Sequence, residues 1–92
     1  MDKKDIAQVL EQIGSLLELK GENPFRVRAY RTAARAITAF PGDLAPALAS
    51  GELAAVKGIG PATLELAEEV LGTGRSKLLD ELQDEEIGRA HV

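Results

Sequence analysis

The Val-Lys-Gly-Ile-Gly stretch at 56–60, with Pro61 directly after it, constrains the fold of this chain more than any other feature. Gly58 and Gly60 can adopt positive φ and let another backbone approach closely. Pro61 suits the first position of a helix, where its missing N–H would be unpaired in any case. We therefore predict helix, tight turn, helix, with Ile59 pointing into the core and helical segments at 52–55 and 61–71.

Such a turn has two interpretations. Glycine N–H groups beside a new helix N-terminus form an anion site, and the anion we expect is a nucleic-acid phosphate, with Lys57 adding a positive charge. The alternative is a turn that only lets two helices pack. A dinucleotide-binding fingerprint is disfavoured, because no strand pattern precedes the glycines and no third glycine follows at the required spacing.

Composition predicts a single small all-α domain. Of the 92 residues, 45% are apolar, mostly Ala and Leu, and runs of β-branched residues are absent. There is no cysteine, which excludes disulfides and thiolate metal sites. No membrane-length apolar run or signal peptide is present, so we expect a cytoplasmic protein without a membrane partner.

Apolar spacing and helix-capping residues place the remaining helices. We expect a first helix from Asp2 or Asp5 to Lys20, a second from Pro24 to Phe40 with Asn23 as its N-cap, a short helix at 43–48 capped by Asp43, and a last helix at 75–83. The residues expected to be buried in the three longer ones are Ile6, Val9, Leu10, Ile13, Leu16, Leu17, then Phe25, Ala29, Ala33, Ala34, Ile37, Phe40, then Leu78, Leu79 and Leu82.

Charge is unevenly distributed, although the formal net charge is −4. Arg28, Arg31 and Arg35 share one face of the second helix by their spacing, and Arg26 lies beside it. We expect Tyr30 to place its hydroxyl on that face. A patch of one sign indicates phosphate contact, whereas the alternatives are a merely solvated face or contact with an acidic protein. The acids gather near the C-terminal end, at Asp80, Glu81, Asp84, Glu85 and Glu86.

Three motifs together resemble the N-terminal domain of family X DNA polymerases, especially the bacterial and archaeal branch. They are Gly-Glu-Asn-Pro-Phe-Arg at 21–26, Arg-Ala-Tyr-Arg-Thr-Ala-Ala at 28–34, and Gly-Ile-Gly at 58–60 followed by Thr-Gly at 73–74. The resemblance covers about residues 3–86, so we assign 1–86 to such a domain. It implies a small helical bundle with a helix-hairpin-helix motif, acting as a monomer in DNA repair. Its ligand would be gapped or nicked DNA near the downstream 5′-phosphate.

The resemblance also implies site residues. Arg26 and Tyr30 match family positions that hold the 5′-phosphate. A monovalent cation, Na⁺ or K⁺, is expected on the main-chain carbonyls of Ala54, Val56 and Ile59. The polymerase carboxylates and their Mg²⁺ belong to a separate palm domain, so no other cofactor is expected here. The complete expected set of phosphate contacts is Arg26, Arg28, Tyr30, Arg31, Arg35, Lys57, Gly58 and Gly60.

Vertebrate repair members of this family use the domain as a deoxyribose-phosphate lyase, with a lysine as nucleophile. The counterpart of that lysine is Leu66, and a second, phosphate-holding lysine falls on Ala62. Leucine supplies no amine, so we expect no catalytic residue in this chain. The alternatives are a lyase with a relocated lysine, Lys57 or Lys20, a stand-alone helix-hairpin-helix module, and a protein-interaction module.

Residues 87–92 stop matching the family. Their sequence, Ile-Gly-Arg-Ala-His-Val, equals what a common sequencing-library adapter encodes up to its in-frame stop. We interpret the segment as adapter-encoded, with a genuine frayed tail as the alternative. On either interpretation His91, the only histidine, is assigned no role.

Overall fold

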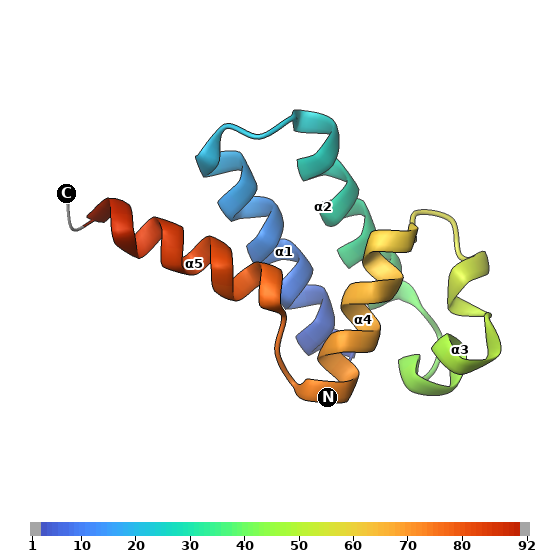
Figure 1. Ribbon diagram of the computed structural model, residues 1–92. Coiled ribbons are helices and arrows are strands. Elements are labelled where there is room, and N and C mark those ends of the chain that lie inside the picture. The colour runs from blue at the N-terminus through green and yellow to red at the C-terminus, as the bar shows by residue number, and fades with distance from the viewer. Residues whose placement is uncertain (1–2, 91–92) are drawn as a thin grey trace.

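The computed structural model describes residues 3–90, and the burial of side chains from residue 3 to residue 85. These residues form a bundle of helices without a strand (Figure 1), and no described helix is long and apolar enough to cross a membrane. The all-α prediction, with four longer helices and two short ones, is confirmed. In chain order the elements are α1 (Lys3–Lys20), α2 (Pro24–Ala39), α3 (Leu44–Ser50), the 3₁₀ turn η1 (Leu53–Ala55), α4 (Pro61–Thr73) and α5 (Lys77–Ala90).

The antiparallel pair of α1 and α2 supplies the largest part of the core (Figure 1). The buried stripe of α1 recurs every three or four residues, which places it on one face of the helix. Gly14 belongs to this face. A Cβ on Gly14 would lie 3.4 Å from Arg31 Cγ and 3.6 Å from the Val27 carbonyl oxygen, so the two helices approach closely at this point. The stripe consists of Ile6, Leu10, Ile13 and Leu17, each at most 1% exposed.

Helix α2 begins as predicted, but its buried face is rotated from the predicted one. The Asn23 side chain accepts a hydrogen bond from the Phe25 N–H at 2.9 Å, and Pro24 takes the first helical position. Phe25 and Ala29, which we expected to be buried, are exposed, and the prediction for these two is wrong. The other predicted residues, Ala33, Ala34, Ile37 and Phe40, are buried as predicted, and Val27 and Tyr30 are buried beside them.

The middle of the chain follows the predicted pattern of short helix, turn and longer helix. Asp43 precedes α3, but its side chain makes no capping hydrogen bond, contrary to the prediction. Helix α4 runs two residues past its expected end, because the αL residue that ends it is Gly74, with φ of 80°. Leu66, Ala67 and Val70 carry the buried face of α4.

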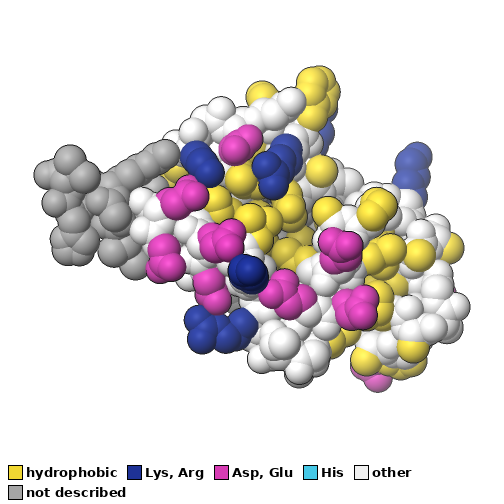
Figure 2. Space-filling view, in the orientation of Figure 1, with side chains coloured by type: hydrophobic (Ala, Val, Ile, Leu, Met, Phe, Trp, Pro, Cys, Tyr) yellow, Lys and Arg dark blue, Asp and Glu magenta, His cyan; other side chains and the backbone are white. Residues whose placement is uncertain are grey.

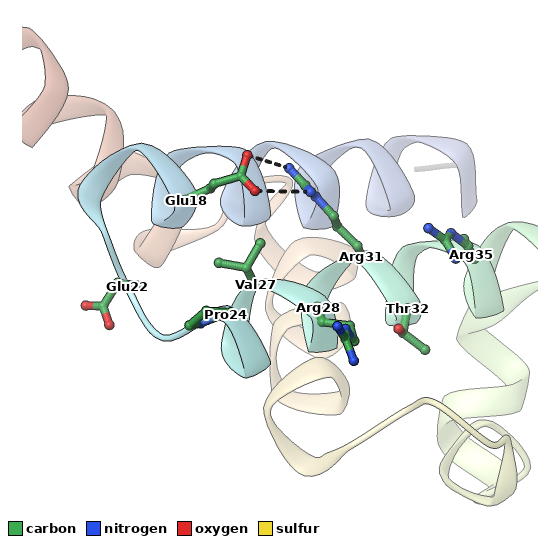
Figure 3. Close-up of a pocket in the computed structure, with 8 residues that line it drawn as sticks. All are labelled: Glu18, Glu22, Pro24, Val27, Arg28, Arg31, Thr32 and Arg35. Atoms are coloured by element: carbon green, nitrogen blue, oxygen red, sulfur yellow. Dashed lines mark hydrogen bonds and ion pairs between the residues drawn. The ribbon is translucent and has the colours of Figure 1, made fainter.

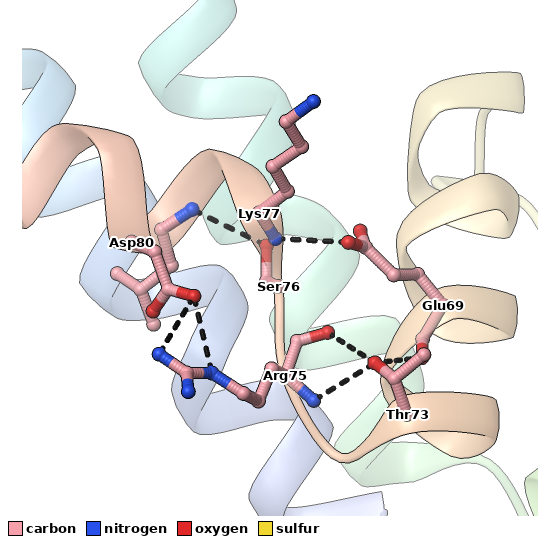
Figure 4. Close-up of polar contacts among 7 residues, drawn as sticks. Glu69, Thr73, Arg75, Ser76, Lys77 and Asp80 are labelled. Atoms are coloured by element: carbon pink, nitrogen blue, oxygen red, sulfur yellow. Dashed lines mark hydrogen bonds and ion pairs between the residues drawn. The ribbon is translucent and has the colours of Figure 1, made fainter.

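A polar corner joins α4 to α5 (Figure 4). The Glu69 carboxylate of α4 accepts the Lys77 N–H at 2.9 Å, which pairs one of the donors that a helix start leaves open. Thr73 Oγ1 accepts the Arg75 N–H at 3.2 Å and lies 2.9 Å from the Glu69 carbonyl oxygen. Arg75 lies outside the helix and forms an ion pair with Asp80 at 3.1 Å.

Helix α5 therefore starts at Lys77 and not at residue 75, and it continues to Ala90, beyond the predicted end at residue 83. The segment 87–90 is helical, whereas residues 91 and 92, and with them His91, lie outside the described part. Leu79 and Leu82 pack into the core as predicted, and Leu78 is half-buried.

Two leucines of α1 test this account of the core. Leu10 is fully buried, whereas Leu19 is 66% exposed. Leu10→Ala removes packed methyl groups and is expected to lower the free energy of unfolding by roughly 2–5 kcal/mol. Leu19→Ala, the matched control, is expected to change it by less than about 0.5 kcal/mol. Urea unfolding followed by circular dichroism measures both; equal effects would contradict the assigned packing of α1.

Candidate nucleic-acid interface

The turn at 56–60 is closed by main-chain hydrogen bonds and anchored by one buried side chain. The Ile59 N–H donates to the Val56 carbonyl at 3.2 Å, and the Leu64 N–H donates to the Gly60 carbonyl at 3.1 Å. Ile59 is 9% exposed and belongs to the core cluster, so the prediction that it points inward is confirmed. Anchoring Ile59 in the core fixes the turn relative to the rest of the bundle.

The two glycines of the turn have different conformations. Gly58 has φ of 96°, in the region that favours glycine. A Cβ on Gly58 would lie 3.2 Å from Thr32 Cγ2 and 3.7 Å from Ala36 Cβ, so the turn rests directly on α2. Gly60 has φ of −100°, and a Cβ on it would meet nothing within 4 Å. Of the two glycines expected to be able to adopt positive φ, only Gly58 does so, and the space beside Gly60 is open.

The arginines of α2 line a pocket of about 570 Å³ between α2 and the end of α1 (Figure 3). Arg31 contacts Glu18 of α1 through two nitrogen–oxygen pairs, at 3.3 and 3.4 Å. Arg28 and Arg35 are exposed and make no interaction with the other residues drawn in Figure 3. Glu18 and Glu22 also line the pocket, so the expected patch of one sign is wrong: two carboxylates lie among the arginines.

A second hollow, of about 450 Å³, lies between α2 and the turn and is lined by Phe25, Arg28, Ala29, Thr32 and residues 58–60. Arg28 and Thr32 line both hollows. The arginine face and the turn, which lie about thirty residues apart in the chain, therefore form one continuous surface. We call this surface, made of both hollows, the hairpin groove.

Phe25 is the residue of the hairpin groove that sequence reasoning missed. Its side chain is 77% exposed although it is one of only two phenylalanines in the chain. The sequence alone does not settle its position, because Phe25, Ala29 and Ala33 recur at a spacing of four, while Val27, Tyr30 and Ala34 recur at spacings of three and four. The structure buries Val27, Tyr30 and Ala34 and leaves Phe25 exposed.

The remaining predicted contact residues lie in different environments. Lys57 is exposed in the turn. Arg26 is exposed and lies 3.9 Å from Glu22. Tyr30 is only 8% exposed and packs in the core, because it lies on the buried stripe of α2. Its ring is therefore largely covered, and the placement of its hydroxyl on the arginine face stays a prediction.

The predicted cation ligands are main-chain carbonyls around the turn. Ala54 lies in η1, while Val56 and Ile59 lie in the turn itself. The Val56 carbonyl accepts the hydrogen bond that closes the turn, and a carbonyl oxygen has a second lone pair for a further ligand. No side-chain cluster of three or more His, Cys, Asp or Glu suited to a metal occurs in the described part of the chain.

The positions that resemble the lyase lysines lie on α4. Leu66 is 5% exposed and packs in the core, as expected, whereas Ala62 is exposed. Elsewhere, Lys3 Nζ donates to the Phe40 carbonyl, which ties the start of α1 to the end of α2. Lys20 forms an ion pair with Glu85 at 3.0 Å.

The turn between η1 and α4, packed on an arginine-bearing helix, is the arrangement of a helix-hairpin-helix domain. Residues 1–76 match the model of the helix-hairpin-helix domain family, and the chain belongs to that family. A relative is the DNA polymerase/3′-5′ exonuclease PolX of Bacillus subtilis (strain 168), which is 39% identical over 85 residues. These residues are 92% of this chain but only 14% of the relative. The resemblance to family X polymerases is confirmed.

The glycines provide a test of how the turn is built. Gly58→Ala places a Cβ against Thr32 at positive φ and is expected to cost roughly 1–3 kcal/mol of unfolding free energy. Gly60→Ala has ordinary φ and open space, so it is expected to leave stability within about 0.5 kcal/mol of the parent. Denaturant unfolding distinguishes the two; a larger loss at Gly60 than at Gly58 would contradict the described turn.

Proposed function

We propose that this chain is the DNA-binding domain of a family X repair polymerase, holding gapped or nicked DNA by its backbone phosphates near a downstream 5′-phosphate. DNA binding is the role that the helix-hairpin-helix family and the PolX relative support. The observation that carries the finer proposal is the continuity of the hairpin groove, in which the turn and the arginines of α2 meet at Arg28 and Thr32.

The start of α4 suits a phosphate. Gly60 stands at the N-cap position and has no side chain with which to cap the helix. The first N–H groups of a helix have no partner within the helix, so those of the first α4 turn are available to a ligand. The helix dipole favours an anion there. The open space beside Gly60 lets a phosphate approach the backbone, and Lys57 and Arg28 supply positive charge on either side.

Phe25 adds a different kind of contact. An exposed aromatic ring next to a positively charged groove is a platform on which a base stacks without regard to its sequence. Gapped DNA exposes unpaired bases, which an intact duplex does not. Phe25 therefore favours an interrupted DNA duplex as the ligand.

The distribution of acids limits how DNA approaches. Acidic side chains gather over α4 and α5 on the face shown in Figure 2. Phosphates are repelled from such a surface, which leaves the hairpin groove as the surface that DNA contacts. The exposed acids of α5 include Glu81, Asp84 and Glu85.

The carbonyl groups around the turn also suggest which ions the domain requires. We propose that Na⁺ or K⁺ binds the carbonyls of Ala54, Val56 and Ile59 and supplies a positive charge beside the DNA backbone. Mg²⁺ belongs to the polymerase reaction, whose carboxylates the family resemblance assigns to a palm domain. We also propose that the domain acts on DNA as a monomer and that it does so in the cytoplasm.

A salt titration tests the proposed function. Arg28→Gln removes one phosphate contact, so binding to a gapped, 5′-phosphorylated duplex is expected to weaken by up to about tenfold at low salt, whatever the base sequence. The slope of log affinity against log salt is expected to become shallower by about one. Fluorescence anisotropy measures both quantities.

Lys77→Gln is the matched control. It removes the same charge at the start of α5, where the Lys77 N–H pairs with Glu69, a residue roughly 12 Å along α4 from its first residue by helix length, and is expected to leave the slope unchanged. A parent protein whose affinity for DNA does not depend on salt would overturn the proposal in favour of a protein-interaction module.

We further propose that the domain binds abasic sites without cleaving them. Schiff-base formation needs an amine at the sugar, and α4 contains no lysine. Borohydride trapping on an incised abasic site is therefore expected to give little cross-linking, and Lys57→Ala is expected to remove what remains. Rapid cross-linking of the parent to a single lysine would show instead that a relocated nucleophile makes this domain a lyase.

A further inference from the structure

The three arginines that line the pocket are not equally available to a ligand. Arg28 and Arg35 are exposed, whereas Arg31 already has an anion in place, the carboxylate of Glu18. The two contacts join two guanidinium nitrogens to the two carboxylate oxygens, at 3.3 and 3.4 Å. Glu18 comes from α1 and Arg31 from α2, so this pair depends on the tertiary structure and not on neighbouring positions in one helix.

The paired geometry is also the geometry of phosphate binding. A guanidinium donates hydrogen bonds to carboxylate oxygens and to phosphate oxygens from the same pair of N–H groups. Glu18 therefore occupies N–H groups of Arg31 that a DNA phosphate would otherwise bind (Figure 3). Because Arg31 lines the same pocket as Arg28 and Arg35, a DNA strand in the hairpin groove would pass close to it.

The pair is weak enough to exchange. The Arg31 side chain is 39% exposed and that of Glu18 is 63% exposed, and ion pairs so accessible to water contribute little stability. The stem of Arg31 lies close over Gly14 of α1, since a Cβ added to Gly14 would be 3.4 Å from Arg31 Cγ. The guanidinium can therefore change its partner while the stem stays packed.

We propose that Glu18 is an internal competitor for the DNA phosphate at Arg31, an inference that rests on the proposed function. In the free domain Glu18 holds Arg31. On binding, Arg28 and Arg35 meet the DNA backbone, and Arg31 exchanges the carboxylate for a phosphate. Glu18 thereby lowers the affinity for DNA and keeps binding reversible, without blocking the arginines that make the first contact.

The exchange of Glu18 for a phosphate at Arg31 changes how DNA affinity depends on salt concentration. A phosphate bound by Arg31 releases a counterion from DNA, but the freed Glu18 carboxylate gathers a cation in return. The salt slope of the parent is therefore shallower than the number of its phosphate contacts implies. If the Glu18 carboxylate only positioned Arg31 for DNA, its removal would weaken DNA binding. If it competes with the phosphate, its removal strengthens DNA binding.

The test compares Glu18→Gln with Glu81→Gln. Both variants remove one negative charge, but Glu81 is an exposed residue of α5, which packs on α1. On the gapped, 5′-phosphorylated duplex, Glu18→Gln is expected to bind about two- to fivefold more tightly than Glu81→Gln. Its salt slope is expected to be steeper by up to about one. Circular dichroism and thermal unfolding establish that each variant is folded.

A double variant identifies the partner. Arg31→Gln keeps the part of the stem that lies over Gly14 and removes the charge. In that background, Glu18→Gln is expected to give no gain over Glu81→Gln. The proposal is overturned if Glu18→Gln weakens binding, if it only equals the control, or if its advantage persists without Arg31. Absence of salt-dependent DNA binding by the parent would overturn the proposed function as well, so the two failures are distinguishable.

Discussion

The packing of one glycine turn against one helix determines where the hairpin groove of this domain lies. Because Gly58 has no side chain, the turn packs closely against Thr32 and Ala36 of α2. The next residue, Ile59, is buried in the core. This contact brings the start of α4 to the same side of the bundle as the arginines of α2. A bulkier residue at 58 would push the turn away from α2, because tightly packed interiors give way little.

The arginines show how the charge of a surface differs from the charge of a sequence segment. Between residues 26 and 35 the chain carries arginines and no acid. Once α1 packs on α2, however, Glu18 pairs with Arg31, and Glu22 of the connecting loop lies near Arg26. In the hairpin groove, Arg28 and Arg35 therefore carry the positive charge that these carboxylates do not pair. Acids of α4 and α5 lie on another part of the surface, with basic side chains among them (Figure 2).

The corner between α4 and α5 keeps that acidic surface in place. Glu69 pairs with the first N–H of α5, and Thr73 binds the loop between the two helices (Figure 4). Because these partners are main-chain groups, the corner constrains the direction of α5 itself and not only one side chain. Asp80, through Arg75, adds an ion pair on the same corner.

The sequence by itself determined the helices, the turn and the family. Apolar spacing, Asn23 with Pro24, and the glycines before Pro61 are local signals, and they act through backbone conformation and helix geometry that need no distant partner. They did not determine which face of a helix is covered at its first turn, as Phe25 shows, nor that Tyr30 lies in the core. Only the tertiary structure decided that the turn and the arginines share one groove and that Glu18 faces Arg31. Both depend on how separate helices pack. Packing brings together residues that are far apart in the chain, and their separation in the sequence does not reveal their distance in space.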